Sequence, residues 1–131
     1  MLAHLLADVA AADPDAPGRA AEVGRQRARD LPRPPARRAA SCLKALADEM
    51  ATLGFDPVLE ADPEGTSGEI TFRRCPFREL AALYPDLVCQ LHRGLTEGML
   101  SELADGHPCR VEGFATLVDA DPCRAEVTVG D

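Results

Sequence analysis

The chain has 131 residues, enough for one compact domain with a helical extension, and 46% of them are hydrophobic. Its formal net charge is −8, so the chain as a whole should be repelled by the phosphates of nucleic acids. The opening residues lack the basic segment of a secretory signal, and no apolar run approaches the roughly 20 residues that a membrane-spanning helix needs. These features argue against a membrane protein and predict a soluble, cytoplasmic one.

The charge is unevenly distributed along the chain. Seven of the fourteen basic residues, all arginines, lie between positions 19 and 38, where only Glu22 and Asp30 oppose them. The favoured interpretation is a solvated helix followed by a basic linker. An arm that contacts phosphates is the alternative.

Two helices are predicted in the amino-terminal part of the chain. Apolar residues at helical spacing predict the first, which Asp13-Pro14-Asp15 ends, and the second should run from about Pro17 to Asp30. The proline-rich stretch 31–35 then makes a stiff, extended break. We therefore expect a helical linker or dimerisation segment at 1–35 and a compact domain at 36–131.

The compact domain should combine helices with two β-hairpins. From Cys123 onward, small or apolar residues alternate with polar ones, as a half-buried antiparallel strand requires. The element order predicts an α+β fold, in which an antiparallel sheet of about four strands has helices packed on one face. The predicted elements are helix 36–53, strands 57–61 and 69–73, a short helix ending near Tyr84, helix 85–104, and strands 110–117 and 123–129.

The chain contains five cysteines, an odd number. In a reducing cytoplasm, this number favours metal or cluster ligation, or redox sensing, over a disulfide framework. Cys42 lies beside a leucine in a predicted helix and is interpreted as a packing residue. The candidate ligands are Cys75, Cys89, Cys109, Cys123 and the neighbouring His92.

The spacing of these residues suggests which of them could share a site. Cys89 and His92 are three residues apart on one predicted helix, so they occupy the same face, and Cys75 precedes that helix closely enough to reach it. Cys109 and Cys123 should lie at opposite ends of the last hairpin, on the order of 20 Å apart, so one site cannot use both. Cys123 is favoured because it faces the same side as the apolar residues of its strand.

These residues also resemble a known family. The run Cys75-Pro76-Phe77-Arg78-Glu79-Leu80-Ala81, followed by Pro85, Leu87-Val88-Cys89, His92, Gly98 and the late Cys123, resembles the carboxy-terminal domain of bacterial and archaeal winged-helix regulators. That family includes the iron–sulfur-sensing repressors of the Suf operon and relatives with metanogen output domains.

The resemblance implies the sensor or effector domain of a transcriptional regulator, a homodimer whose winged helices read DNA. Its iron–sulfur cluster would be held by Cys75, Cys89 and Cys123, and we add His92 as a candidate fourth ligand. The chain departs from the family in two ways: the interval between Cys89 and Cys123 is longer than in the Suf repressors, and no winged helix is expected in it. DNA contact is therefore expected only indirectly or through a missing winged-helix domain.

Two other functions remain open. The same cysteines and His92 could form a structural zinc site in a dimerisation module, or they could be buried beside a pocket for a small organic ligand. No enzyme is predicted, because the sequence lacks G-x-S-x-G and H-E-x-x-H motifs and a glycine-rich loop between a strand and a helix.

Overall fold

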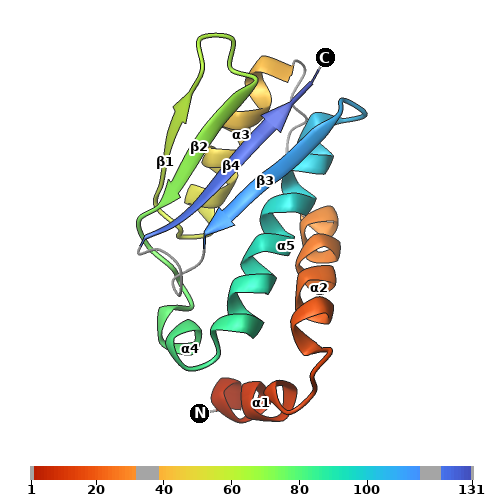
Figure 1. Ribbon diagram of the computed structural model, residues 1–131, viewed down its shortest axis with the longest axis vertical. Coiled ribbons are helices and arrows are strands. Elements are labelled where there is room, and N and C mark those ends of the chain that lie inside the picture. The colour runs from red at the N-terminus through yellow and green to blue at the C-terminus, as the bar shows by residue number, and fades with distance from the viewer. Residues whose placement is uncertain (1, 32–38, 116–121, 131) are drawn as a thin grey trace.

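The computed structural model describes residues 2–31, 39–115 and 122–130, which form five helices and one four-stranded sheet (Figure 1). None of the described helices combines the length and the apolar character needed to cross a membrane. The helices are α1 (Leu2–Ala11), α2 (Ala16–Asp30), α3 (Ala39–Thr52), α4 (Arg78–Leu83) and α5 (Pro85–Ala104). The strands are β1 (Pro57–Ala61), β2 (Ser67–Phe72), β3 (Cys109–Ala115) and β4 (Cys123–Val129).

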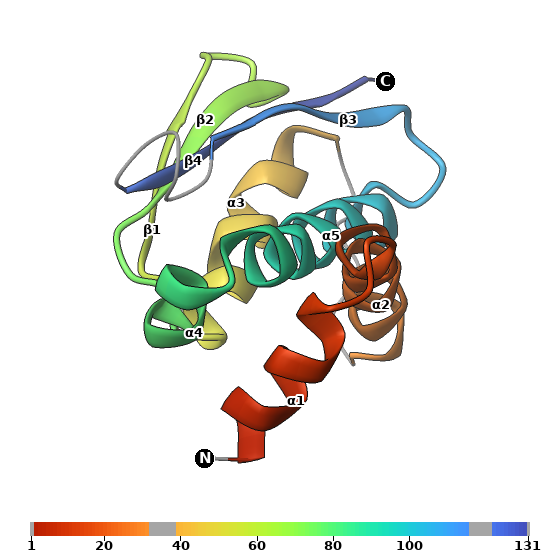
Figure 2. The same cartoon turned by 60° about the horizontal axis from the view of Figure 1, so that its bottom comes forward.

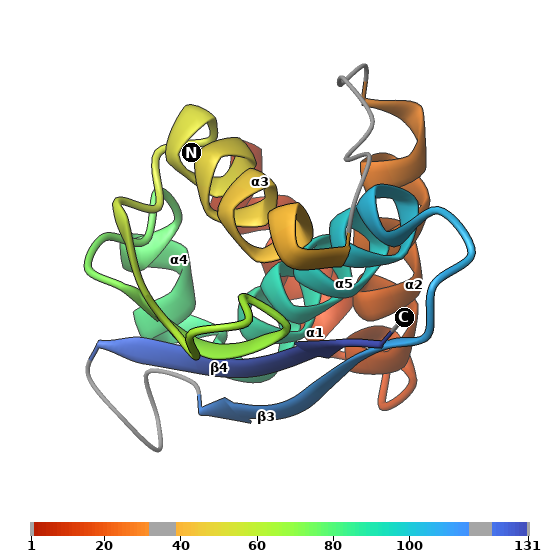
Figure 3. The same ribbon diagram turned by 90° about the horizontal axis from the view of Figure 1, so that it is seen from above.

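The sheet is antiparallel throughout, with the strand order β1-β2-β4-β3. Both predicted hairpins, β1–β2 and β3–β4, are present, and the long-range pairing of β2 with β4 joins them into one sheet. Figures 2 and 3 show the helices gathered on one side of this sheet. The prediction of an α+β fold with helices on one face is therefore confirmed.

Most element boundaries agree with the predictions to within a few residues. Helix α5 has the predicted bounds, since Pro85 suits the first turn of a helix and the apolar stripe continues to its end. Strand β2 begins at Ser67 rather than Glu69, because Ser67 pairs with Thr128 of β4 and Gly68 pairs with Ala61 of β1. The Asp62 side chain stabilises the turn before it by accepting hydrogen bonds from the backbone N–H groups of Thr66 (2.9 Å) and Ser67 (3.3 Å). Parts of two predicted elements, at 36–38 and 116–117, lie outside the described residues.

The core lies between the sheet and the helices α3 and α5. Every second residue of β4, from Cys123 to Val129, is buried against the helices. Cys42 of α3 is fully buried as well, and its thiol donates a hydrogen bond to the carbonyl oxygen of Leu103 (3.4 Å), which agrees with a packing role. The largest fully buried side chains include those of Phe55, Leu43, Leu46, Met50, Ile70, Met99, Leu100, Leu103 and Val127.

Helix α2 packs along α5 at very short range. Its buried face consists of small residues that include Ala21, Gly24 and Ala28. Gly94 and Gly98 of α5 lie opposite, and a Cβ atom added to Gly98 would come within 2.7 Å of the Arg25 carbonyl oxygen. Glycine is required here because the two backbones touch. This segment, predicted as part of a linker, is thus packed against the domain in the structure.

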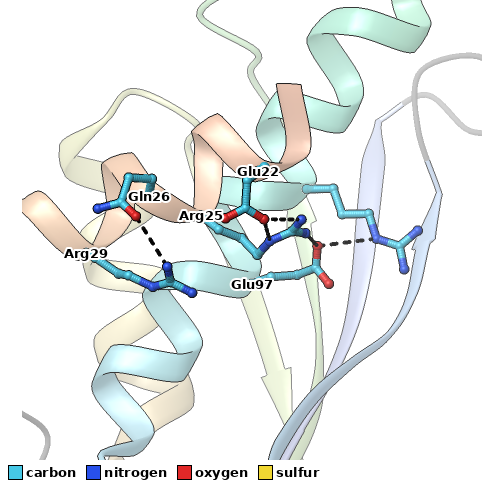
Figure 4. Close-up of polar contacts among 6 residues, drawn as sticks. Glu22, Arg25, Gln26, Arg29 and Glu97 are labelled. Atoms are coloured by element: carbon cyan, nitrogen blue, oxygen red, sulfur yellow. Dashed lines mark hydrogen bonds and ion pairs between the residues drawn. The ribbon is translucent and has the colours of Figure 1, made fainter. Parts of the chain in front are cut away.

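Hydrogen bonds and ion pairs also join α2 and α5 at the exposed side of their contact. The Arg25 guanidinium of α2 donates hydrogen bonds to Glu22 (2.8 Å) and to Glu97 of α5 (3.3 Å), as Figure 4 shows. Arg93 lies 3.7 Å from the same Glu97 carboxylate. The Glu22 hydrogen bond is the main reason why the pKa of Arg25 is raised and that of Glu22 is lowered. Arg25 therefore connects α2 to Glu97 of α5, and Arg93 of α5 adds a second cation beside the same carboxylate.

Candidate functional site

Three of the four expected ligands, Cys89, His92 and Cys123, are buried. Cys89 and His92 lie in the first half of α5, with exposed fractions of 5% and 2%. Cys123 begins β4 and is paired directly with Phe72 of β2, whose ring centroid lies 4.5 Å from that of His92. The β2–β4 pairing thus brings Cys123 to the aromatic neighbour of His92.

The fourth expected ligand, Cys75, lies at the rim of this region. It follows β2 and is half-buried, and its carbonyl oxygen accepts a hydrogen bond from the backbone N–H of Arg78 at the start of α4 (3.1 Å). Burial raises the pKa of its thiol, although a hydrogen bond from the Phe77 backbone and the charge of Arg78 act in the opposite direction. The thiol form is therefore favoured at neutral pH.

The imidazole of His92 is enclosed by three phenylalanines from different parts of the chain. It stacks on Phe55, which follows α3, with ring centroids 4.1 Å apart and an interplanar angle of 15°. Phe72 of β2 and Phe114 of β3 meet it in edge-to-face geometry, with centroid distances of 4.5 and 5.0 Å. His92 is thus part of the core.

This environment decides the protonation state of His92. Burial lowers the pKa of its imidazole to about 3, because the charged form loses its hydration in an aromatic cavity. Among the described residues, Nε2 of His92 is the buried side-chain nitrogen or oxygen atom that lacks a hydrogen-bond partner. A neutral imidazole with an unpartnered nitrogen can accept a hydrogen bond or a metal ion.

Two further cysteines lie at the opposite end of the sheet. Cys109 is paired with Val129, at the far end of β4 from Cys123, which confirms that the two cysteines occupy opposite ends of the hairpin. Burial raises the pKa of Cys109, and burial together with the neighbouring Cys109 raises that of Cys42. Cys42 and Cys109 therefore form a pair of neighbours well away from the candidate site.

The arrangement does not contain a ready-made metal centre. In the described ranges 2–31, 39–115 and 122–130, which hold all four expected ligands, no three histidine, cysteine, aspartate or glutamate side chains gather closely enough to hold a metal ion. None of the five cysteines, all in these ranges, forms a disulfide bond. The thiols and the imidazole suit an iron–sulfur cluster or zinc in chemical kind, but the described side chains are not gathered around one centre.

The three phenylalanines were missed by the sequence analysis. Phe55, Phe72 and Phe114 come from a loop and two different strands, so no local spacing relates them. A weak signal exists: the chain has only four phenylalanines, and His92 lies within the apolar stripe of α5, where a polar residue needs a special environment.

Comparison of the chain with models of protein families, with curated proteins and with solved structures finds no match.

Proposed function

We propose that this domain is the sensor or effector domain of a transcriptional regulator, and that its sensing region is the core end formed by Cys89, His92 and Cys123 with Cys75 at the rim. The observation that carries the proposal is the buried, unpartnered Nε2 of His92. A buried polar atom without a partner costs free energy, on the order of 1–3 kcal/mol, and a ligand that bonds to it recovers that cost.

The donor chemistry supports a transition metal or an iron–sulfur cluster as that ligand. Thiolate sulfur and neutral imidazole nitrogen are soft or intermediate donors, which these groups prefer to carboxylate oxygen. Since the described side chains are not gathered around one centre, binding requires this end of the core to rearrange. Cys75 is the donor with the greatest freedom to move, because it is half-buried in the segment between β2 and α4.

Helix α5 could transmit a structural change from this region to the amino-terminal helices. It carries Cys89 and His92 in its first half and Gly94 and Gly98 in the contact with α2. Because the two helix backbones touch, a displacement of α5 changes the position of α2 and the amino-terminal helix before it. We assign contact with DNA to a winged-helix domain, because the net charge of −8 on this chain would repel the phosphates of DNA.

Anaerobic reconstitution with ferrous iron and sulfide, and separately with zinc, tests the proposal. We expect a coloured, air-sensitive protein in the first case, and loss of bound metal in Cys75→Ser, Cys89→Ser and Cys123→Ser variants. Cys109→Ser is the matched control, since it removes a thiol from the opposite end of the same hairpin. Colourless protein that binds one zinc ion through the same cysteines would support a structural site instead of a sensor. Folded protein that binds neither iron nor zinc would overturn metal sensing.

A further inference from the structure

Cys42 and Cys109 lie close together although they belong to distant parts of the chain. Cys42 lies in the first turn of α3, and Cys109 is the first residue of β3. Figures 1 and 3 show the start of α3, the end of α5 and the start of β3 at the same end of the molecule. Both cysteines belong to one packed region, since Cys42 is a member of the hydrophobic core and Cys109 packs against that core.

The connection between α5 and β3 explains this proximity. The Cys42 thiol donates a hydrogen bond to the carbonyl oxygen of Leu103, in the last turn of α5 (3.4 Å). The chain then turns sharply at Asp105 and Gly106, which have φ angles of 45° and 91°, and enters β3 at Cys109. Burial and the nearby Cys109 raise the pKa of Cys42, so the two sulfur atoms are close enough to interact.

The two thiols differ in their access to solvent. Cys42 is fully buried, whereas Cys109 is half-buried and contributes to the wall of a surface hollow of about 390 Å³. The other residues that line this hollow are mostly polar, among them Thr66, Ser67 and Arg110. A small polar oxidant can therefore reach Cys109 from solvent, while Cys42 lies behind it in the core.

We propose that Cys109 is a site of oxidation by hydrogen peroxide and that Cys42 then forms a disulfide bond with it. The Cys109 thiolate attacks one peroxide oxygen, the O–O bond breaks, and the products are Cys109 sulfenic acid and, after protonation of the leaving hydroxide, water. The sulfur of Cys42 then attacks the sulfenic sulfur, so that an S–S bond forms, the S–O bond breaks and a second water leaves. Overall, two thiols are oxidised to one disulfide, and one peroxide is reduced to two waters.

Burial predicts that the first step is slow. The thiolate is the nucleophilic form of cysteine, and burial raises the pKa of Cys109, so little thiolate is present at neutral pH. The pair should therefore respond to prolonged exposure to peroxide, unlike the activated cysteine of a peroxidase.

The second step requires the start of β3 to approach α3. A disulfide bond needs the two Cα atoms about 4.4–6.8 Å apart. Strand β3 lies at the edge of the sheet and is paired only with β4, so its first residue can move more easily than a residue of a central strand. Cys42 must also release the Leu103 carbonyl, which costs little because a thiol is a weak hydrogen-bond donor.

Peptide mapping of the full chain, treated with one equivalent of hydrogen peroxide in the presence of a chelator, tests the proposal. Trypsin cleaves after arginine and lysine and places the five cysteines on five different peptides, with Cys42 on residues 39–44 and Cys109 on residues 94–110. We expect the loss of two thiols per chain and a link between these two peptides that dithiothreitol reverses. In urea, the same treatment should give mixed pairings, because only the fold selects this pair.

Three variants assign the reaction to its residues. Cys109→Ser should abolish the link. Cys42→Ala should leave Cys109 as a sulfenic acid, which dimedone traps on residues 94–110, and it provides a second test if Cys109→Ser destabilises the fold. Cys75→Ser is the matched control, because Cys75 is also half-buried but lies outside the pair, and it should leave the link unchanged.

A folded chain in which peroxide does not link residues 39–44 to residues 94–110 would overturn the proposal. A link from Cys109 to another cysteine or to a second chain would do the same, as would an equal yield of the Cys42–Cys109 link in urea. Neither thiol belongs to the proposed metal-binding set, and the chelator removes metal, so this result is independent of whether the chain binds iron or zinc.

Discussion

The imidazole of His92 lies nearly parallel to the ring of Phe55, with 4.1 Å between the two ring centroids. His92 belongs to the first half of α5 and Phe55 to the segment between α3 and β1, so the contact joins α5 to the chain that leads from α3 into the sheet. Because phenylalanine rings cannot solvate a cation as water does, the contact favours the neutral imidazole. This single pair therefore links the packing of the core to its response to pH.

The first prediction concerns the pH dependence of stability. The folded-state pKa of His92 is about 3 and its ordinary value is 6.5, so below pH 6.5 the unfolded chain binds a proton that the folded chain does not. The free energy of unfolding should fall as the pH drops from about 6.5 toward 3, by up to about 1.4 kcal/mol per pH unit from this group. Urea unfolding at pH 7.5, 6.0 and 5.0 measures the slope.

Replacing His92 by phenylalanine isolates this contribution. The His92→Phe variant keeps an aromatic ring among Phe55, Phe72 and Phe114 and removes the titrating group. Relative to the variant, the wild-type chain should lose roughly 2 kcal/mol between pH 7.5 and 5.0, since carboxylates contribute equally to both. Parallel stability profiles for the two proteins would show that His92 is not buried in its neutral form.

The second prediction concerns the contact between α2 and α5. Gly24→Ala and Gly94→Ala each place a methyl group against the backbone of the facing helix, which must then move away. We expect each change to destabilise the fold by about 1–3 kcal/mol, the usual cost of overpacking a core. Thermal or urea unfolding measures the difference.

Gly18→Ala is the matched control for these changes. It lies in the same helix, but a Cβ atom there meets no other atom within 4 Å. Alanine at an exposed helical position should stabilise the fold by about 0.5–1 kcal/mol relative to glycine. Destabilisation by all three substitutions alike would contradict the close approach of the two helices.

The third prediction concerns a row of carboxylates on the solvent face of the sheet. Glu60 is paired with Glu69, and Glu69 is paired with Glu126, so three glutamates lie side by side across β1, β2 and β4. Like charges directly opposite each other destabilise a sheet by about 0.2–1 kcal/mol per pair. Glu69→Gln should therefore raise the free energy of unfolding by an amount in this range at low ionic strength.

Salt separates this effect from a change in strand propensity. The gain from Glu69→Gln should shrink at about 1 M salt, where the screening length is near 3 Å. Glu64→Gln changes the net charge equally but lies in the turn between β1 and β2, so it should produce little gain. A gain that is the same at both salt concentrations would refute an electrostatic origin.

The fourth prediction concerns the ion pairs of Glu97 and their contribution to the contact between α2 and α5. Glu97 receives Arg25 from α2 and Arg93 from its own helix, in a partly buried position. Glu97→Gln removes the charge that holds both arginines and should cost under about 1 kcal/mol, because these ion pairs remain partly solvated. A double-mutant cycle with Arg25→Ala measures the coupling free energy between Arg25 of α2 and Glu97 of α5. A coupling of zero would mean that the whole loss of stability in Glu97→Gln comes from contacts within α5.

Much of the fold follows from local patterns in the chain. The bounds of α5 were predicted from Pro85 and an apolar stripe, and the alternation after Cys123 predicted β4, because both signals arise from side-chain spacing within one element. The separation of Cys109 from Cys123 was also predictable, since the antiparallel pairing of one hairpin determines which residues lie at which end.

The candidate site was only partly predictable. Cys89 and His92 were expected on one helix face, and in the structure both are buried in the first half of α5. The expectation that they meet Cys75 and Cys123 around one metal or cluster stays a prediction. Its outcome depends on side-chain positions that differ by a few ångströms, and spacing along the chain does not define such small distances.

Sequence by itself determined the class of the fold, its helices and strands, and the presence of buried thiols, because periodicity and turn residues act over a few neighbouring positions. Tertiary structure alone decided the pairing of β2 with β4, the enclosure of His92 by three phenylalanines and the proximity of Cys42 to Cys109. The physical reason is that burial depends on which distant segments fill the same volume, and that choice is made by the packing of the whole core rather than by any segment alone.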